Sequence, residues 1–339
     1  FNTFINEMKE IQTKYYIKEF NKENSDTKDD KTGVSKSLYS KSIQASLLVF
    51  PDGKFGKDAF ENHHIDTQSK NGKKIISKRI KEIKDYIKDE DNNVKIEKLS
   101  ELSIKYSNII DNILKSKDKS VFIYCNKVQG CGLLLFAKIL ENFGFKKANG
   151  TENTKELRYG LLSETLEIKK INERFNKPDN MKGDYIKVLL GSKKVSQGFT
   201  FKNVQIIHIV TPHWNFTETS QAMARGIRQF SHNDLEKAGI KPIVDVYLHE
   251  AVPVINKKGV LQKSIDYLMY KKSETKDLEI KPIERLLKES AFDCALDYNR
   301  NNRNNFEDNS RECEYQNCQY SCDGIPKKYI DNNYSIPDN

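Results

Sequence analysis

The clearest pattern along the chain is a series of unbroken apolar segments in its central part. Unbroken apolar strands are typical of a parallel sheet that is covered on both faces, because neither side of such a strand meets water. The segments that we predict to be strands are SVFIYC (120–125), YIKVLLG (185–191), VQIIHIV (204–210) and IVDVYLH (243–249).

Helical stretches alternate with these predicted strands. The segment GLLLFAKILENFGF (132–145) is predicted to be a helix that ends at Gly144, and two more helices are predicted at 217–230 and 259–290. Strands that alternate with helices indicate an α/β fold, in which a parallel sheet is flanked by helices.

The pattern before the first predicted strand is more polar. Phe4, Ile5, Met8 and Ile11 recur at helical spacing and predict a helix over 1–19. Beyond it, the pattern predicts a polar loop at 20–36 and an apolar segment at 42–56 that ends in a Pro-Asp-Gly turn. A second polar stretch is predicted at 66–78, and two amphipathic helices at 76–90 and 95–117.

These changes of character divide the chain into four predicted parts. The first two are a largely helical region with polar loops at 1–117 and an α/β lobe at 118–255. They are followed by a helical extension at 256–296 and an irregular tail that contains cysteines at 297–339. A length of 339 residues fits one large or two modest domains.

Composition adds a charge argument. The formal net charge is +9, which suits a polyanionic partner such as nucleic acid or a nucleotide, although a generally Lys-rich composition accounts for it equally well. No apolar run is long enough to span a membrane, and no secretory signal opens the chain. We therefore expect an intracellular protein, and the first residue, Phe1, indicates a fragment of a longer one.

Candidate chemistry gathers where two predicted strands end. The loop GSKKVSQGFTF (191–201) follows one strand, with two glycines that allow close approach of a ligand, Gly191 and Gly198, and three hydroxyls, from Ser192, Ser196 and Thr200. Open parallel sheets bind ligands at this edge.

The second cluster is QAMARGIR (221–228), beside the next strand. Arg225 and Arg228 are spaced to share one helix face, and Gln221 lies one turn earlier on it. Guanidinium groups match phosphate oxygens, so this face suits a phosphate. The alternative is a solvated basic face on a surface helix.

Three segments in order resemble the second RecA-like lobe of superfamily II helicases and translocases. VFIYCNKVQGCGLLLFAKILENFGF (121–145) is similar to motif IV, VLLGSKKVSQGFTFKNVQIIHIV (188–210) to motif V, and PHWNFTETSQAMARGIRQ (212–229) to motif VI. Together with SIQASLLVFPDG (42–53) and ESAFDCALDYNRN (289–301), they resemble helicases of large cytoplasmic DNA viruses, related to poxvirus nucleoside triphosphate phosphohydrolase I and early transcription factor ATPase.

The resemblance implies roles for the candidate residues. Arg225 and Arg228 would be catalytic, with Arg228 as the arginine finger, and ATP would be contacted by Gly198, Gln221, Arg225 and Arg228. Nucleic acid would be contacted by Ser192, Lys193, Ser196 and Thr200. The chain departs from the family pattern at Gln197, where an acid is common, and this puts the coupling to nucleic acid in doubt; it also has Ala224-Arg225-Gly226 in place of the commoner Gly-Arg-Ala.

A motor of this class needs a first lobe with a GxxxxGK[ST] phosphate loop and an acidic pair for Mg²⁺. DGKFGKDAF (52–60) has the wrong spacing, and the acids of KDEDNN (88–93) do not follow an apolar strand. We therefore expect ATP and Mg²⁺ to be bound mainly by a lobe outside this chain, which alone would be inactive.

The expected partners are DNA or RNA and, by the viral resemblance, RNA polymerase or transcription factors, in the host cytoplasm or the virion. The alternative function is a non-catalytic adaptor that binds nucleic acid or polymerase with a RecA-like fold.

Six cysteines complete the candidates. Cys125 and Cys131 lie in an apolar segment and are expected in the core. The others are spaced C-x18-C-x4-C-x3-C, which predicts a structural Zn²⁺ site, with free thiols as the alternative, at Cys294, Cys313, Cys318 and Cys322.

Overall fold

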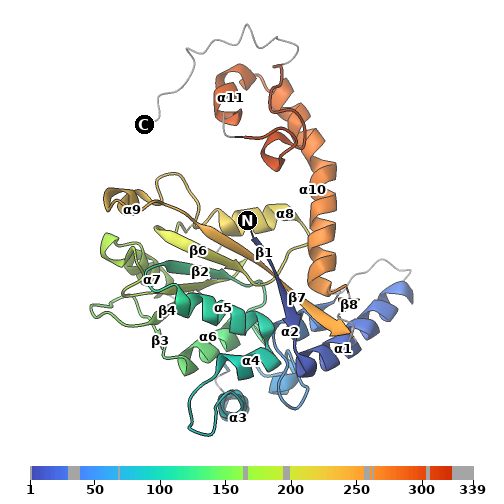
Figure 1. The fold of residues 1–339 in the computed structure, drawn as a ribbon, viewed down its shortest axis with the longest axis vertical. Helices are drawn as coiled ribbons and strands as arrows, with labels where there is room; N and C mark the ends of the chain where they lie inside the picture. The colour runs from blue at the N-terminus through green and yellow to red at the C-terminus, as the bar shows by residue number, and fades with distance from the viewer. Residues whose placement is uncertain are drawn as a thin grey trace. The chain divides into compact units, whose positions relative to one another are not determined.

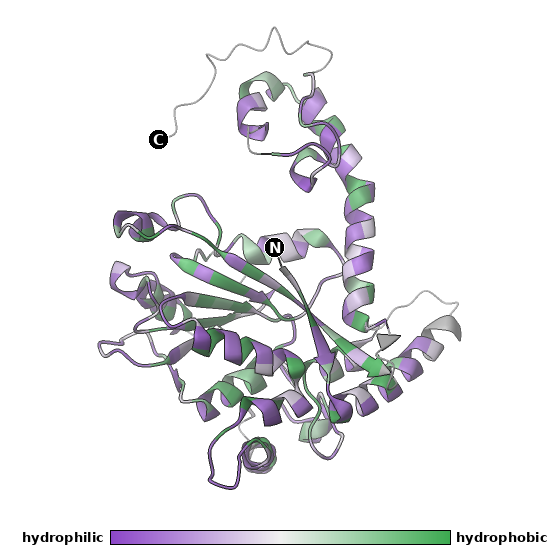
Figure 2. Ribbon diagram, viewed as in Figure 1, coloured by the Kyte–Doolittle hydropathy of each residue, from purple (hydrophilic) through white to green (hydrophobic). Residues whose placement is uncertain are grey.

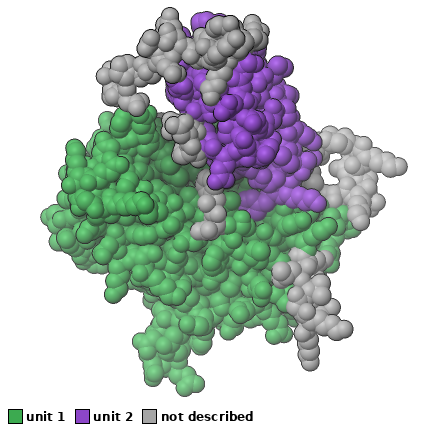
Figure 3. Space-filling view, turned by 45° about the horizontal axis from the view of Figure 1, so that its top comes forward, with its two compact units in different colours: residues 1–213, 217–269 green, residues 214–216, 270–339 purple. Residues whose placement is uncertain are grey.

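The computed structural model (Figure 1) describes residues 2–29, 39–67, 69–162, 167–193, 199–255, 260–261, 263–302 and 306–322. The chain forms two compact units, of which the first comprises residues 1–213 and 217–269 and the second residues 214–216 and 270–339 (Figure 3). Within the described residues, none of the helices combines the length and the apolar composition that crossing a membrane requires.

A parallel sheet forms the centre of the first unit. In the described part of the chain its order is β1-β7-β6-β2-β5-β4-β3, and every neighbouring pair on this path is parallel. The short β8 pairs with β7 in antiparallel fashion. The strands are β1 (Asn2–Met8), β2 (Ser120–Tyr124), β3 (Lys146–Lys147), β4 (Arg158–Leu162), β5 (Val188–Gly191), β6 (Val204–Ile209), β7 (Asp245–Ile255) and β8 (Val260–Leu261).

Helices cover both faces of this sheet, so the expected RecA-like α/β class is confirmed. In Figure 1, α5 and α6 lie on one face and α8 lies on the other. The helices are α1 (Glu10–Asp29), α2 (Ser40–Leu47), α3 (Lys70–Tyr86), α4 (Ile96–Leu102), α5 (Ile104–Lys115), α6 (Leu133–Asn142), α7 (Glu167–Phe175), α8 (Phe216–Met223), α9 (Asn233–Lys237), α10 (Ile265–Ser290) and α11 (Cys294–Asn301).

The central strands are buried along their whole length, as their unbroken apolar sequence requires. Every residue of β2, β5 and β6 is buried, and these strands are predominantly hydrophobic in colour in Figure 2. Register aligns their carboxyl ends, because Tyr124 pairs with Gly191 on one side and with Ile209 on the other. The loops that follow these three strands therefore emerge side by side.

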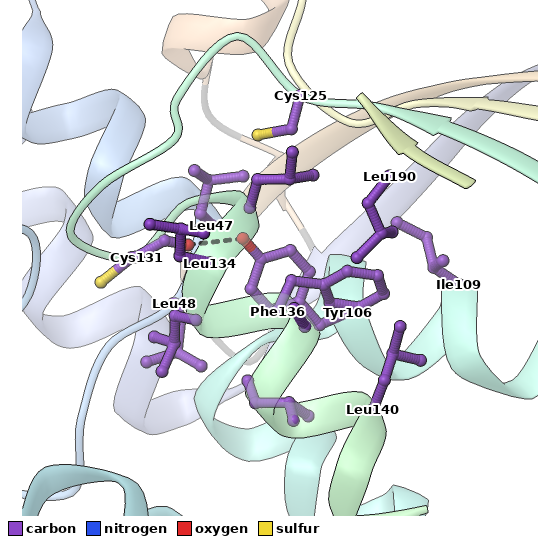
Figure 4. Packing of buried hydrophobic residues seen from close by; sticks show 14 of the residues in the cluster. Leu47, Leu48, Tyr106, Ile109, Cys125, Cys131, Leu134, Phe136, Leu140 and Leu190 are labelled. Carbon is purple, nitrogen blue, oxygen red and sulfur yellow. Dashed lines mark hydrogen bonds between the residues drawn. The ribbon is translucent and has the colours of Figure 1, made fainter. Parts of the chain in front are cut away.

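The helical region before β2 shares the core of the sheet. Tyr106 of α5 lies against Phe136 of α6, with ring centroids 4.6 Å apart, and its hydroxyl donates to the carbonyl oxygen of Cys131 (Figure 4). Cys125 and Cys131 are buried free thiols in the same cluster, as expected. Residues before and after 117 thus form one hydrophobic core.

The amino terminus differs from the sequence-based prediction. Residues 2–8 form β1, paired in parallel with β7, instead of the first half of a helix; α1 begins only at Glu10 and runs through most of the expected loop at 20–36, of which residues 30–36 lie outside the described part. The side-chain amide of Asn6 donates to the carbonyl oxygen of Glu250 at 3.0 Å. The apolar spacing suited a helix, but the open edge of β7 offered this segment backbone partners that are remote in sequence.

Two other helical predictions changed at their boundaries. The helix expected over 95–117 is broken at Ser103, whose hydroxyl accepts from the backbone N–H of Tyr106 at 3.1 Å and so caps α5. The polar stretch expected at 66–78 contains the first half of α3, which begins at Lys70. The strand β4 was not predicted, because its sequence RYGLL carries no long apolar run, and the short helix α7 was missed although Ile168, Ile171 and Phe175 are at helical spacing.

A buried ion pair joins four elements of the first unit. Lys105 of α5 and Asp266 of α10 are both fully buried, and their charged atoms are 2.6 Å apart. The ammonium group of Lys105 also donates to the carbonyl oxygen of Val210, just beyond β6, at 2.9 Å. The carboxylate of Asp266 accepts from the backbone N–H of Ala251 in β7 at 2.9 Å. Each charge thus has a polar partner besides its counterion.

We predict that Asp266→Ala lowers the free energy of unfolding by about 3–5 kcal/mol, because it leaves the Lys105 ammonium buried without its counterion. The matched control is Asp111→Ala, which breaks an ion pair with Lys115 whose side chains are 39% and 75% exposed and should cost less than about 1 kcal/mol. Denaturant unfolding of both variants measures the difference. Equal losses in the two variants would contradict the assigned role of the buried pair.

Candidate functional site

The loops that follow β2, β5 and β6 meet at one edge of the sheet. In parallel α/β sheets this edge is where ligands bind, since loops from several strands converge there. Two of these loops carry the residues that the sequence singled out. Ser196 and Gly198 lie outside the described residues, so only their neighbours in the loop after β5 can be placed.

The loop after β5 is anchored at both ends. Ser192 is buried, with 5% of its surface exposed, whereas Lys193 is exposed and forms an ion pair with Glu218 of α8 at 2.9 Å. At the other end, the carbonyl oxygen of Thr200 accepts from the side-chain amide of Asn176 at 2.9 Å. Phe201 is fully buried against Phe122 of β2, with ring centroids 4.8 Å apart.

The helix that was predicted to carry both arginines ends before it reaches them. α8 stops at Met223, and Arg225 and Arg228 lie in the turns that follow. Gly226, between them, lies against β6: a β-carbon at this position would be 3.1 Å from the Ile207 side chain. The prediction that Arg225 and Arg228 share one face of a helix is therefore wrong. The chain leaves the helix because it must pass this close to the sheet, and the two side chains are brought together by the turn.

Both arginines attach to the far end of the loop after β5. A guanidinium N–H of Arg228 donates to the hydroxyl of Thr200 at 2.7 Å, and one of Arg225 donates to the carbonyl oxygen of Phe199 at 3.4 Å. The backbone reinforces the link, because the N–H of Phe201 donates to the carbonyl oxygen of Arg225 at 2.9 Å. The two segments that the sequence singled out, 191–201 and 221–228, are thus joined directly.

The electrostatics of this pair favour an anion. Arg225 is half-buried, and the pKa of its guanidinium is lowered by burial and by the neighbouring charge of Arg228. Its Nε atom is buried without a hydrogen-bond acceptor, and within the described residues neither arginine forms an ion pair with a carboxylate. Gln221, the third predicted residue of this cluster, lies exposed on α8.

Sequence reasoning assigned no chemistry to a buried histidine beside this site. His213 follows β6 and lies with Nδ1 3.0 Å from the Glu218 carboxylate and Nε2 3.0 Å from the Tyr124 hydroxyl. Burial lowers the pKa of His213 and outweighs the opposing effect of Glu218, so the imidazole is neutral near pH 7, donating from Nδ1 and accepting at Nε2. Lys193 pairs with the same Glu218 carboxylate. The connected side chains of Tyr124, His213, Glu218 and Lys193 therefore link the ends of β2, β5 and β6.

The predicted zinc site is wrong. Its four cysteines form two disulfides, Cys294–Cys322 and Cys313–Cys318, with Cα atoms 5.6 and 4.8 Å apart. Bonded sulfurs cannot act as thiolate ligands, and in the described part of the chain no group of three or more His, Cys, Asp or Glu side chains is placed to hold a metal ion. The alternative prediction, four free thiols, is also wrong.

The second unit is ordered around its own buried ion pair. Arg285 of α10 pairs with Glu314 at 3.2 Å, stacks over Tyr320 and donates to the carbonyl oxygen of Asn317 at 2.6 Å. Tyr320 in turn packs on Tyr298 of α11, beside the Cys294–Cys322 bond. The tail was expected to be irregular from residue 297, but it is helical up to Asn301, and its described residues 306–322 are packed in the second unit.

We predict that the chain, unfolded without reductant, exposes two reactive thiols, those of Cys125 and Cys131, and that reduction raises this number to six. Thiol titration in denaturant measures both values. Reduction of the native chain should also loosen 306–322 first, since such cross-links stabilise by roughly 2–4 kcal/mol. Six reactive thiols before reduction would contradict the disulfide assignment.

Comparison with known proteins places these features in a family context. Residues 95–229 match the helicase conserved C-terminal domain, a span that includes β2, α6, the loop after β5 and both arginines. The parallel sheet flanked by helices is that of a RecA-like α/β lobe, and residues 95–229 of it are similar to helicase C-terminal domains.

Three of the similar proteins come from viruses. The chain is 39% identical over 304 residues to "Putative helicase 087L" of Invertebrate iridescent virus 3 and 37% identical over 297 residues to "Putative helicase 009L" of Frog virus 3, covering 87% of this chain in both cases. It is 27% identical over 160 residues to the early transcription factor 70 kDa subunit of Monkeypox virus, covering 44% of this chain and 24% of that protein. The chain spans 29% and 28% of the lengths of the first two.

Proposed function

We propose that this chain is the second lobe of an ATP-dependent nucleic-acid translocase. The observation that carries the proposal is the pair of guanidinium groups, Arg225 and Arg228, fastened to the loop after β5 and lacking carboxylate partners among the described residues. Two unneutralised positive charges at the ligand-binding edge of a parallel sheet suit a polyphosphate held from the opposite side by another lobe.

The residues present fit such a group. The buried, unpaired Nε of Arg225 and the mutual repulsion of the two arginines would both be relieved by phosphate oxygens. ATP, bound with Mg²⁺ mainly outside this chain, would supply the phosphoryl group. In this chain Arg228 would stabilise developing negative charge as the arginine finger, Arg225 would hold the γ-phosphate, and Gln221 and Gly198 would complete the contact surface.

The bond from Arg228 to Thr200 provides a coupling route. The loop 192–200 would contact the backbone of nucleic acid through exposed Lys193 and through Ser196 and Thr200, whereas Ser192, which the sequence also suggested, is buried and does not suit such a contact. A change in the position of this loop would move both arginines. The His213–Glu218–Lys193 row attaches this loop to α8 as well. DNA or RNA is therefore the proposed partner. The similarity to a viral early transcription factor subunit favours a role in transcription, with RNA polymerase or transcription factors as further partners.

We predict that Arg228→Ala in the longer, two-lobe protein lowers steady-state ATP turnover at saturating nucleic acid by about 10³-fold or more, because an arginine finger supplies stabilisation of this size. Arg228→Lys should recover only part of it, since an ammonium group lacks the planar fork. Binding of nucleic acid without nucleotide should persist. Gln229→Ala, an exposed neighbour in the same turn, is the matched control and should retain turnover.

Two outcomes distinguish the roles of the arginines. If Arg225→Ala abolishes turnover and Arg228→Ala does not, Arg225 is the finger. If both variants turn over ATP at the wild-type rate while thermal melting is unchanged, the arginines form only a basic surface and the motor function is refuted.

We also predict that this chain by itself hydrolyses no ATP, because its sequence contains no phosphate-binding loop of the GxxxxGK[ST] type. Nucleic-acid-stimulated turnover by the purified chain, abolished by Arg228→Ala so that a contaminant is excluded, would overturn this prediction.

A further inference from the structure

Helix α3 carries a row of exposed lysines that the arginine site does not use. Its opposite face is apolar and packs into the core through Ile76 and Ile83. At 3.6 residues per turn, the lysines fall on the outward half of the helix. This α3 lysine row consists of Lys70, Lys73, Lys74, Lys78, Lys81 and Lys84, all of which are exposed.

The charge of the row is not neutralised by its surroundings. No acidic residue occurs in the sequence between Asp66 and Glu82. The carboxylate of Glu82 forms an ion pair with the buried Arg79 at 2.5 Å, and that of Asp52 forms one with the same arginine at 3.0 Å. These two acids therefore pair with Arg79 and not with the lysines. In the described part of the chain, the ion pairs formed by carboxylates involve none of the six lysines, and Asp85 is the one acid exposed among them on the helix.

The arrangement works against the stability of the helix that carries it. The first turn of α3 has no acidic residue and contains Lys70 and Lys73, so positive charge lies at the positive end of the helix dipole. Lys70, Lys74 and Lys78 are spaced at i, i+4, where like charges repel. The helix is supported instead by Ser69, whose hydroxyl accepts from the backbone N–H of Gly72 at 3.1 Å, and by its buried apolar face. A face that only needed solvation would not require this charge distribution.

We propose that the α3 lysine row is a nucleic-acid-binding surface that contacts the backbone phosphates of a duplex. The inference rests on the proposed function and adds a second contact to it. The row spans roughly 21 Å from Lys70 to Lys84, at 1.5 Å per residue. Over that length a DNA duplex presents about 12 phosphate charges. Lysine is a point charge without a planar fork, so the row holds the backbone and reads no bases.

The position of α3 makes this contact separate from the arginine site. In Figure 1, α3 is seen end-on at the lower edge of the first unit, while α8 lies above the sheet, with the sheet and the α5–α6 layer between them. A duplex held on the row would therefore extend along the face of the unit opposite to α8. The α3 lysine row would keep the nucleic acid bound while the contacts of the loop 192–200 with it break and form again.

The test measures binding of the full chain to a fluorescent 20-base-pair duplex by anisotropy, over a KCl titration. In the triple variant Lys73→Gln/Lys74→Gln/Lys78→Gln, we expect the slope of log affinity against log salt to become shallower by about 2–3, because each lost phosphate contact removes roughly 0.9. Affinity at moderate salt should fall on the order of tenfold or more, equally for duplexes of different sequence.

The matched control is Lys271→Gln/Lys272→Gln/Lys276→Gln on α10, which makes the same change in net charge with lysines of the second unit. It should leave the slope nearly unchanged. Glutamine retains helix propensity, so thermal melting checks that both variants fold.

Three results would overturn the proposal. The first is a wild-type slope in the α3 variant while the chain still binds the duplex, which would leave the proposed translocase function intact. The second is an equal loss in the α10 control, which would mean that net charge alone drives binding. The third is that the α3 variant loses binding to an acidic peptide or to phosphatidylserine vesicles while its binding to the duplex is unchanged. Failure of the wild-type chain to bind any nucleic acid would instead refute the nucleic-acid part of the proposed function.

Discussion

The constraint on which the structure depends is the hydrogen bonding of an all-parallel sheet. Parallel neighbours cannot be joined by tight turns, so each connection must cross a face of the sheet and return to the same edge. This requirement covers both faces with helices and buries the central strands β2, β5 and β6 along their whole length. It also brings the loops after β2, β5 and β6 to one edge, although these loops are separated by tens of residues in sequence. The link between Thr200 and Arg228 is a consequence of that topology.

Polar groups inside the first unit hold the terminal elements to the sheet. Asn6 of β1 is bonded to the β7 backbone, and the Lys105–Asp266 pair joins α5, α10 and the two strands β6 and β7. Apolar packing alone would allow these elements to slide. Directed hydrogen bonds in a region of low dielectric select one arrangement, because any other leaves a charge unpaired.

Positive charge is used in two different ways on this molecule. Arg225 and Arg228 are positioned by the hydrogen bonds that they donate to oxygen atoms of residues 199 and 200, so their geometry is defined. The α3 lysines extend from an exposed helix face, and what they share is density of charge. Planar, fixed guanidinium groups suit recognition of a single phosphate group, and mobile ammonium groups suit a long backbone.

The sequence by itself determined the class of fold, and it singled out the segments that contain the candidate site residues. The strands β2, β5, β6 and β7 and the helix α6 were predicted because burial on both sides makes a strand apolar without interruption, a signal that is local. The three ordered motifs then indicated a helicase C-terminal lobe, and the match over 95–229 agrees with them.

Only the tertiary structure decided the features that depend on remote partners. Residues 2–8 became a strand because β7 offered an open edge, and α8 ended at Met223 because Gly226 approaches β6. The pairing of four cysteines into two disulfides depended on which sulfurs folding brought close, which spacing along the chain does not specify. The partners of Arg225, Arg228 and His213 were likewise invisible in the sequence. These three residues follow β6, whereas Phe199 and Thr200 follow β5 and Tyr124 ends β2, so that only the sheet makes them neighbours.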